Sequence, residues 1–392
     1  MKKQLLWALL ALALAGCGAS GNTGSDGTGD APPPTDPTVA SGPLTSLGPL
    51  GVAGTRLDDT GTQVLLNASA ARPASELRLG MFADAEGLVA PSTGTGLATT
   101  SVAQSIVLGP VTGIDPSRRE IRVMGVPVRA DANTLLDGIE RLERLTVGDW
   151  VEVHGLRLPA NEGTLATRLI ALRAPEDRSV EVLGSVSDFS AGAPIVAAAG
   201  LRIELANASI ATASPAGVQL LPPGIAALTP GEPVRIRGTY DPATGTVTAT
   251  SVTTGFAPAR PEGKLVYLEG IVVARTSTLF AVGDVYVDTT IIGAQLTLGT
   301  RVRLRGRMAG GVLRVDQVTE LAAGALIEYV VEGPISTFGS PSDFTVRGER
   351  IDASQAVVSG GDAALLGQGR RVRVKGVAGP GKLDATEVAI LG

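Results

Sequence analysis

Five pairs of glycines with one common spacing dominate the sequence, because in each pair six residues separate the two glycines. The pairs are Gly80 and Gly87, Gly148 and Gly155, Gly231 and Gly238, Gly299 and Gly306, and Gly369 and Gly376. In the last three copies apolar and basic residues alternate between the glycines, as in Val302-Arg303-Leu304-Arg305. Such alternation is typical of a half-buried β-strand. Its recurrence at a fixed spacing indicates tandem copies of one structural module.

The sequence around each glycine pair repeats as well. Each copy opens with a strand around a glycine, continues through a hairpin turn, and ends with a closing strand after the glycine pair. The hairpins centre on Gly54, Gly125, Gly200, Gly283 and Gly348, since glycine supplies the positive φ that such turns need. The repeats predict module one at residues 42–103, module two at 106–174, module three at 180–254, module four at 265–321 and module five at 326–391.

Module two also contains a helix-like pattern. Between Thr134 and Leu145, the residues Leu135, Leu136, Ile139 and Leu142 have helical spacing, which predicts a short helix between the third and fourth strands. Three strands, a helix and two strands is the order of the OB-fold, a small five-stranded barrel. A small β-sandwich is the alternative. We therefore expect an all-β chain with short helices, a tandem array of about five OB-like barrels after a disordered tether.

Composition supports this fold class and limits the function. Hydrophobic residues make up 44% of the chain but aromatic residues only 3%, so the cores must consist of aliphatic side chains. Modules of about 55 to 75 residues have marginal cores, so neighbouring modules are expected to pack together. The net charge of −5 is small for this length and gives no global attraction to nucleic acid.

The N-terminus is typical of an export signal. Residues 1–17 contain two lysines, an apolar run too short to span a bilayer, and small residues before Cys17, which predicts a secretory signal peptide. The last four of these residues resemble a bacterial lipobox, which implies lipidation of Cys17 and anchoring to a membrane. Gly18 follows, where an inner-membrane retention signal would usually carry Asp, so in a Gram-negative host we expect the outer membrane. Residues 18–41 are rich in Gly, Ser, Thr, Asp and Pro and predict a disordered tether.

The repeated glycine and valine signatures resemble a family of OB-like domains of unknown function found in bacterial envelope lipoproteins. The resemblance covers roughly residues 42 to 391 and implies no catalytic residues. Module one departs most from the pattern, because Ala83 and Ala85 stand where the other copies carry larger aliphatic residues.

Motifs for catalysis and cofactor binding are missing. His154 is the only histidine and Cys17 the only cysteine, and no GxSxG sequence accompanies them. We expect no metal and no other cofactor, since His/Cys clusters, calcium loops and a complete phosphate-binding loop are absent from the sequence. A distant pair of carboxylates for glycoside hydrolysis stays open.

One candidate ligand face lies in module two. Alternation places Trp150, Glu152 and His154 together on the outward face of the fourth strand. An aromatic ring beside a carboxylate and an imidazole is a suitable platform for a small ligand. The alternative, which we favour, is that a neighbouring module covers Trp150 and that the three residues fill a joint.

A second candidate face is basic. The outward positions of the fourth strands in modules three to five are Arg235, Arg237, Arg303, Arg305, Arg373 and Lys375. They predict contact with an anionic glycan, a lipid headgroup or an acidic envelope protein. The alternative, which we favour, is a solvated face neutralised by cross-strand partners such as Asp316 or Glu387.

Taken together, the sequence favours a non-catalytic, membrane-anchored envelope protein that acts in binding or as a scaffold. The rival interpretation is an oligosaccharide- or anion-binding protein that uses the OB faces, and an enzyme is third. Nucleic acid is not an expected partner, because such binding stacks bases on aromatic side chains and this chain has few.

Overall fold

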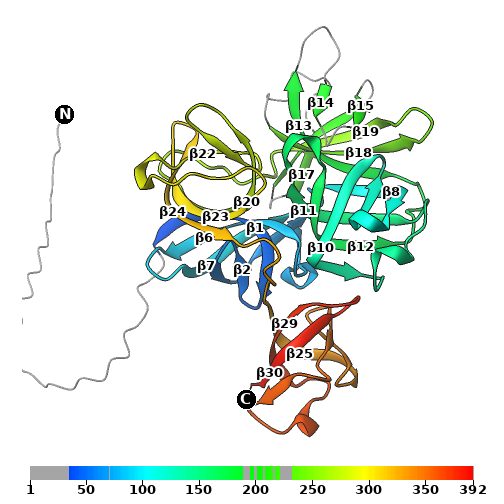
Figure 1. The fold of residues 1–392 in the computed structure, drawn as a ribbon, viewed down its shortest axis with the longest axis vertical. Helices are drawn as coiled ribbons and strands as arrows, with labels where there is room; N and C mark the ends of the chain where they lie inside the picture. The colour runs from blue at the N-terminus through cyan, green and yellow to red at the C-terminus, as the bar shows by residue number, and fades with distance from the viewer. Residues whose placement is uncertain are drawn as a thin grey trace, which may run out of the picture. The chain divides into compact units, whose positions relative to one another are not determined.

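A computed structural model describes residues 35–69, 71–188, 195–197, 201–205, 208–214, 217–220 and 232–391. These residues form β-strands joined by turns and short 3-10 helices (Figure 1). The expected all-β fold class, built from small five-stranded barrels, is confirmed. No helix in the described ranges is long and apolar enough to cross a membrane. The predicted signal peptide, Cys17 and residues 18–34 of the predicted tether lie outside the described residues.

Module two shows the barrel in full. Its elements are β8 (Val107–Asp115), η2 (Pro116–Arg118), β9 (Glu120–Val123), β10 (Val126–Asp137), η3 (Leu142–Arg144), β11 (Trp150–Arg157), η4 (Pro159–Asn161) and β12 (Thr164–Leu172). β9 pairs with β8 and β10, and β12 runs parallel to β10. β11 then closes the ring between β12 and β8. This is the strand order of an OB-fold.

Modules one, four and five close in the same way. Module one contains β1 (Asp36–Leu47), β2 (Leu50–Val52), β3 (Thr55–Asp58), β4 (Gln63–Leu66), β5 (Ala71–Arg72), η1 (Ala74–Glu76), β6 (Phe82–Ala90) and β7 (Thr95–Ala103). Module four contains β20 (Leu265–Arg275), β21 (Phe280–Val282), β22 (Val285–Asp288), η7 (Thr290–Ile292), β23 (Arg301–Ala309) and β24 (Val312–Leu321). Module five contains β25 (Tyr329–Ser340), β26 (Asp343–Val346), β27 (Glu349–Asp352), β28 (Val357–Ser359), η8 (Ala363–Leu365), β29 (Arg371–Ala378) and β30 (Leu383–Ile390). The opening strand pairs with the strand that contains the second glycine of the pair, as β1 with β6, β20 with β23 and β25 with β29. The closing strand runs parallel to the second hairpin strand, as β7 to β3, β24 to β22 and β30 to β27.

Module three has the same pairing in the parts that the structure describes. It contains β13 (Val180–Asp188), β14 (Ile195–Ala197), β15 (Arg202–Glu204), β16 (Ser209–Ser214), β17 (Gly217–Leu220), β18 (Pro233–Asp241) and β19 (Thr246–Thr254). β18 pairs with β13 and β19, while β15 and β16 run parallel to β19. Gly200 and Gly231, two of the predicted repeat glycines, lie outside the described residues.

The repeated glycines have two distinct structural causes. The second glycine of every pair follows a β-bulge, since the register shifts just before Gly87, Gly155, Gly238, Gly306 and Gly376. A Cβ atom at any of these positions would collide with a carbonyl oxygen of the closing strand. The first glycine has a positive φ in the four described copies, and its N–H donates to a carbonyl of the opening strand at 2.7–2.9 Å. The first glycine of each pair therefore permits the turn that leads into the fourth strand, and the second permits the bulge within that strand.

Two predictions of local structure differ from the observed structure, namely the C-terminal end of the tether and the helix in module two. Residues 36–41 belong to β1 rather than to the tether, because residues 38–41 pair with β6 on one edge and β20 on the other. The predicted helix in module two is replaced by a longer β10 and the single turn of η3. Leu135 and Leu136 extend β10, since they pair with Arg168 and Leu169 of β12. Their helical spacing reflects burial at a strand end.

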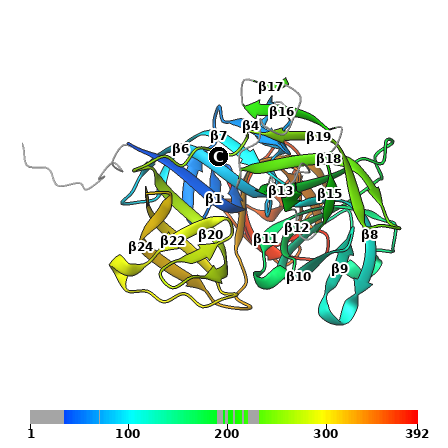
Figure 2. The same ribbon diagram turned by 90° about the horizontal axis from the view of Figure 1, so that it is seen from above.

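β1 pairs with strands of three modules. Inside module one it pairs with β6 along its first part and with β2 near its end. The edges of β1 that these strands leave open pair with other modules: residues 38–41 run parallel to β20, and residues 46–47 run parallel to β25. Figure 2 shows β1 beside β6 and β20. β8 and β13 join modules two and three in a similar way, but antiparallel.

Several of the buried apolar clusters also extend across the boundaries between modules, which are called joints below. One cluster is formed mainly by modules one and five and also includes Leu135 of module two and Leu265 and Tyr267 of module four. A second cluster is shared by modules two and three, and a third lies in module four. A small cluster that contains Val102 and Phe256 joins module one to module three. Ala83 and Ala85 are fully buried in the first cluster together with Leu77 and Leu79, which come from the connection before β6. Those leucines supply core volume that, in the other modules, comes from larger aliphatic residues on the fourth strand.

Candidate functional site

Trp150, Glu152 and His154 lie on one face of β11, but that face is buried. Trp150 is 6% exposed and His154 1% exposed. Trp150 belongs to the apolar cluster shared by modules two and three. The three residues therefore do not form an open ligand platform. They lie in joints between modules, which was the alternative interpretation of the sequence.

The polar part of this joint centres on the Glu152 carboxylate. Asn67 of module one donates from Nδ2 to Glu152 Oε1 at 2.8 Å, and its Oδ1 accepts the Ser105 N–H at 2.8 Å. His154 Nδ1 lies 3.0 Å from the Gln104 carbonyl, and because a carbonyl can only accept, Nδ1 is the donor. His154 Nε2 lies 3.3 Å from Glu152 Oε1, within ion-pair range but without hydrogen-bond geometry.

This environment lowers the pKa of Glu152. Burial alone would raise its pKa, because it disfavours the charged form. The His154 imidazole, the Asn67 amide and the Arg235 guanidinium outweigh burial and lower the pKa from 4.5 to about 2. The joint between modules one and two therefore depends on an ionised carboxylate.

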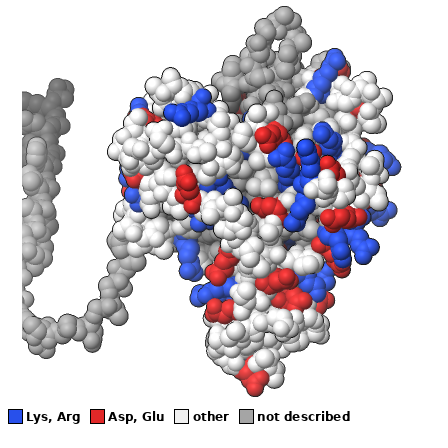
Figure 3. Space-filling model, in the orientation of Figure 1, with Lys and Arg blue, Asp and Glu red and all other residues white. Residues whose placement is uncertain are grey.

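The six basic residues of the second candidate face each contact a carboxylate. Arg235 pairs with Glu181, Arg237 with Asp177, Arg303 with Glu269, Arg305 with Asp316, Arg373 with Glu332 and Lys375 with Glu387. Arg235 is only 4% exposed and also donates to Ser105 Oγ at 2.8 Å, so it belongs to a joint. Figure 3 shows basic and acidic side chains interspersed on the face that it draws. These strands thus carry paired charge, as the alternative interpretation expected.

Modules four and five share one version of this pairing. Glu269 and Glu332 each precede the opening glycine of their module. Glu269 accepts hydrogen bonds from Arg301 and Arg303, and Glu332 accepts from Arg371 and Arg373. Glu269 is 0% exposed. The alternating arginines of these fourth strands therefore hold the first strand of the same barrel, which accounts for the pattern without a ligand.

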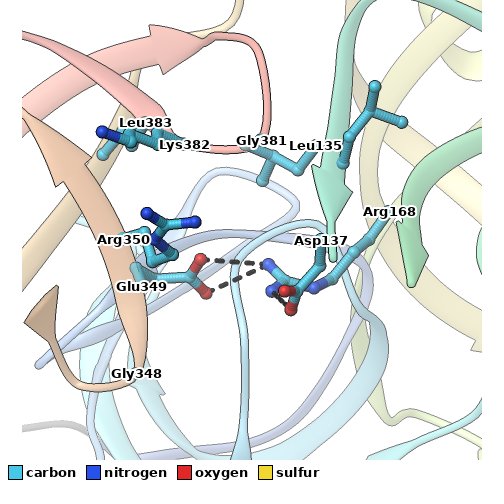
Figure 4. Close-up of a pocket in the computed structure, with 10 residues that line it drawn as sticks. Leu135, Asp137, Arg168, Gly348, Glu349, Arg350, Gly381, Lys382 and Leu383 are labelled. Carbon is cyan, nitrogen blue, oxygen red and sulfur yellow. Dashed lines mark hydrogen bonds and ion pairs between the residues drawn. The ribbon is translucent and has the colours of Figure 1, made fainter. Parts of the chain in front are cut away.

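A buried ion cluster that the sequence analysis missed joins modules one, two and five (Figure 4). Arg168 on β12 donates to Glu349 on β27, and its Nη2 lies 2.5 Å from Asp137 Oδ2. The same arginine donates to the Leu79 carbonyl at 3.0 Å, and Glu349 accepts the Leu79 N–H at 2.7 Å. The one available signal was Arg168 itself, a charge on the closing strand, which lies opposite His154 of β11 on the outer face of the barrel. Its partners are too distant in sequence to be inferred.

Two hollows lie where modules two and five meet. The smaller is the cavity of Figure 4, beside Arg168 and Glu349, and its volume of about 20 Å³ suits one water molecule. The larger is a groove of about 550 Å³. It is lined by Arg119, Asp131, Ala132, Thr134, Leu136, Glu140, Arg141, Leu142, Glu143, Ala378, Gly379, Pro380 and Asp384. Within the described residues, no group of three or more His, Cys, Asp or Glu side chains is placed to hold a metal ion.

Comparison with known proteins identifies the repeat in two places. A family described as a domain of unknown function (DUF5666) matches residues 109–169 and 332–389. The two stretches fall within modules two and five, so the chain contains a repeated domain of unknown function. No curated protein matches the chain.

Proposed function

We propose that this chain is a non-catalytic envelope protein, anchored to a membrane through a lipid on Cys17, whose five modules form one scaffold for binding. The pairing of β1 with β20 and β25 carries the proposal, because it ties three modules into shared sheets. Buried polar contacts add to this coupling, since Arg235 of module three binds Ser105, which lies between modules one and two, and Arg168 joins modules two and five. A set of freely jointed modules would not need these contacts.

Hydrogen exchange on the full chain tests the scaffold. If the modules are locked together, those amides of residues 38–41 and 46–47 that point toward β20 and β25 should exchange as slowly as amides inside a barrel. The matched reference is β10 to β12 of module two, whose pairing lies within one barrel. Fast exchange of those β1 amides beside slow exchange at β12 would show that the modules separate, and would contradict the scaffold.

A separate experiment tests the anchor. Cys17→Ala should abolish labelling by a palmitate analogue and release the protein from the membrane fraction, because the sulfur is the acylation site. Ser20→Ala, a change in the same segment, should leave both unchanged. Labelling of the Cys17→Ala variant would refute the anchor. We further propose the outer membrane as the location, on the basis of Gly18.

An envelope protein, an anionic glycan or a lipid headgroup stays a proposed partner. The basic strands give these anionic ligands little support, because Arg303 and Arg373 already pair with Glu269 and Glu332. A ligand there would have to replace carboxylates that the barrel itself supplies.

A further inference from the structure

The groove between modules two and five has walls that both modules hold in place. On one side, Arg168 of module two binds Glu349 of module five. On the other, Asn133 beside the groove accepts the Ile327 N–H at 2.7 Å and donates to the Ala325 carbonyl at 2.9 Å. The Tyr329 hydroxyl adds a hydrogen bond to the Asn133 carbonyl at 2.8 Å. The chain that leads into module five is thereby fixed to module two, so the groove is preformed.

The lining of the groove is amphipathic. Leu136, Leu142, Ala378 and Pro380 provide apolar surface without an aromatic ring. The volume of about 550 Å³ falls in the range of about 300–1,000 Å³ that is usual for small-ligand sites. Such a lining suits a ligand with both apolar C–H faces and polar edges.

The charged residues of the groove are mainly acidic. Asp131, Glu140, Glu143 and Asp384 outnumber Arg119 and Arg141 by two. Unlike the charges on the fourth strands, Glu140, Arg141 and Glu143 form no ion pair with another residue that the structure describes. Burial and the nearby charge of Asp352 raise the pKa of Asp384, with Lys382 opposing them. The groove therefore has negative charge that its own arginines do not neutralise.

We propose that this groove binds an oligosaccharide that carries free amino groups. Ammonium groups of the sugar would neutralise the surplus carboxylates, while its hydroxyls hydrogen-bond to Arg119, Arg141 and Asp131. The C–H faces of the sugar rings would pack on Leu136 and Pro380. This inference gives the ligand class for the proposed binding scaffold and rests on that binding role, but it does not depend on Cys17.

Calorimetry with the full chain in detergent tests the inference, using a glucosamine hexamer as the probe and its fully N-acetylated form as the comparison. The glucosamine hexamer should bind, and affinity should fall as salt rises, because the contacts are largely electrostatic. The N-acetylated hexamer should bind at least about tenfold more weakly, since it lacks the charge. Equal affinity for the two hexamers, or no binding of the glucosamine hexamer, would overturn the proposal.

Variants locate the site. Glu140→Gln combined with Glu143→Gln should weaken binding about tenfold or more, and Asp384→Asn should act in the same direction. Glu176→Gln removes an exposed carboxylate outside the groove and should have no effect. An equal loss with Glu176→Gln would show binding to net charge alone and would refute the site. Spermidine that competes as well as the hexamer would refute recognition of a sugar. Neither result would alter the exchange pattern of β1, so the scaffold is tested separately.

Discussion

Arg168 Nη1 lies 3.1 and 3.0 Å from the two carboxylate oxygens of Glu349, although 181 positions of sequence separate the two residues. Both side chains are buried, at 3% and 5% exposure for the whole residues. A buried charge that loses its partner is costly, because neither water nor a counter-charge replaces the contact. This pair therefore couples the stability of module two to that of module five.

Replacing Glu349 by Gln should lower the free energy of unfolding by about 3–5 kcal/mol, because Arg168 keeps only Asp137 as an acidic partner. Urea denaturation measures the change. Asp343→Asn, which breaks an exposed pair with Arg350 in the same module, should cost about 0–1 kcal/mol. Equal effects of the two substitutions would contradict the coupling.

Stability should fall in acid because of Glu152. Its pKa is about 2 in the folded chain and near 4.5 when exposed, so the folded state favours the ionised form. That contribution is complete above pH 4.5 and is lost as the pH falls towards 2. The advantage of the wild type over Glu152→Gln in urea denaturation should shrink from about pH 5 to about pH 3. A gap that does not change with pH would show that Glu152 is not ionised in the joint.

Arg235 and Arg237 stand two residues apart on β18 but should respond differently to substitution. Arg235→Gln should cost about 3–5 kcal/mol, because it leaves the half-buried Glu181 and Ser105 without their partner. Arg237→Gln should cost about 0–1 kcal/mol, since Arg237 is 50% exposed and pairs with an exposed Asp177. Thermal denaturation of both variants measures the two losses of stability. Similar losses would argue against a buried joint at Arg235.

The glycine at the bulge should tolerate no side chain. Gly376→Ala should destabilise module five by about 1–3 kcal/mol, because the added Cβ meets the Asp384 carbonyl and the backbone must shift. Gly367→Ala in the same module is the matched control, since a Cβ there has no atom within 4 Å. Hydrogen exchange across β29 and β30 reports the loss. A stable Gly376→Ala variant would mean that the bulge is not needed.

Module two should fold alone but gain stability from module three. The fragment of residues 106–174 contains all strands of a closed barrel. Residues 106–254 add the pairing of β8 with β13 and complete the shared apolar cluster. The longer fragment should therefore unfold at a higher temperature in a circular dichroism melt. Equal melting temperatures would show that the joint contributes nothing, and a random-coil spectrum for the short fragment would show that one barrel is not autonomous.

The barrels could be predicted from sequence because their determinants are local and repeated. Gly148 and Gly155 mark one strand within a few residues, and the hairpin at Gly125 lies close by in the chain. The positive φ values at Gly54, Gly125, Gly283 and Gly348 confirm four of the five predicted hairpin glycines. Gly200 lies outside the described residues.

The joints could not be predicted, because they depend on residues far apart in the chain. Alternation placed Glu152 and His154 correctly on one face of β11, but it carried no information that Asn67 would cover that face. Likewise, alternation placed the arginines of β23 on one face, but it did not identify Glu269 of β20 as the partner of Arg301 and Arg303. The groove residues Glu140 and Asp384 come from different modules, so only the packing of the two modules brings them together.

The pairing of β1 with β20 and β25 has a consequence for the order of folding. β1 belongs to the first module to emerge, yet its pairing partners begin at Leu265 and Tyr329. Until those residues are present, β1 has unsatisfied strand edges that can pair with other chains. Contacts of such long sequence separation also form slowly. A newly made chain should therefore pass through a stage at which it aggregates readily, and dilution or a chaperone that covers β1 should raise the yield of refolded protein.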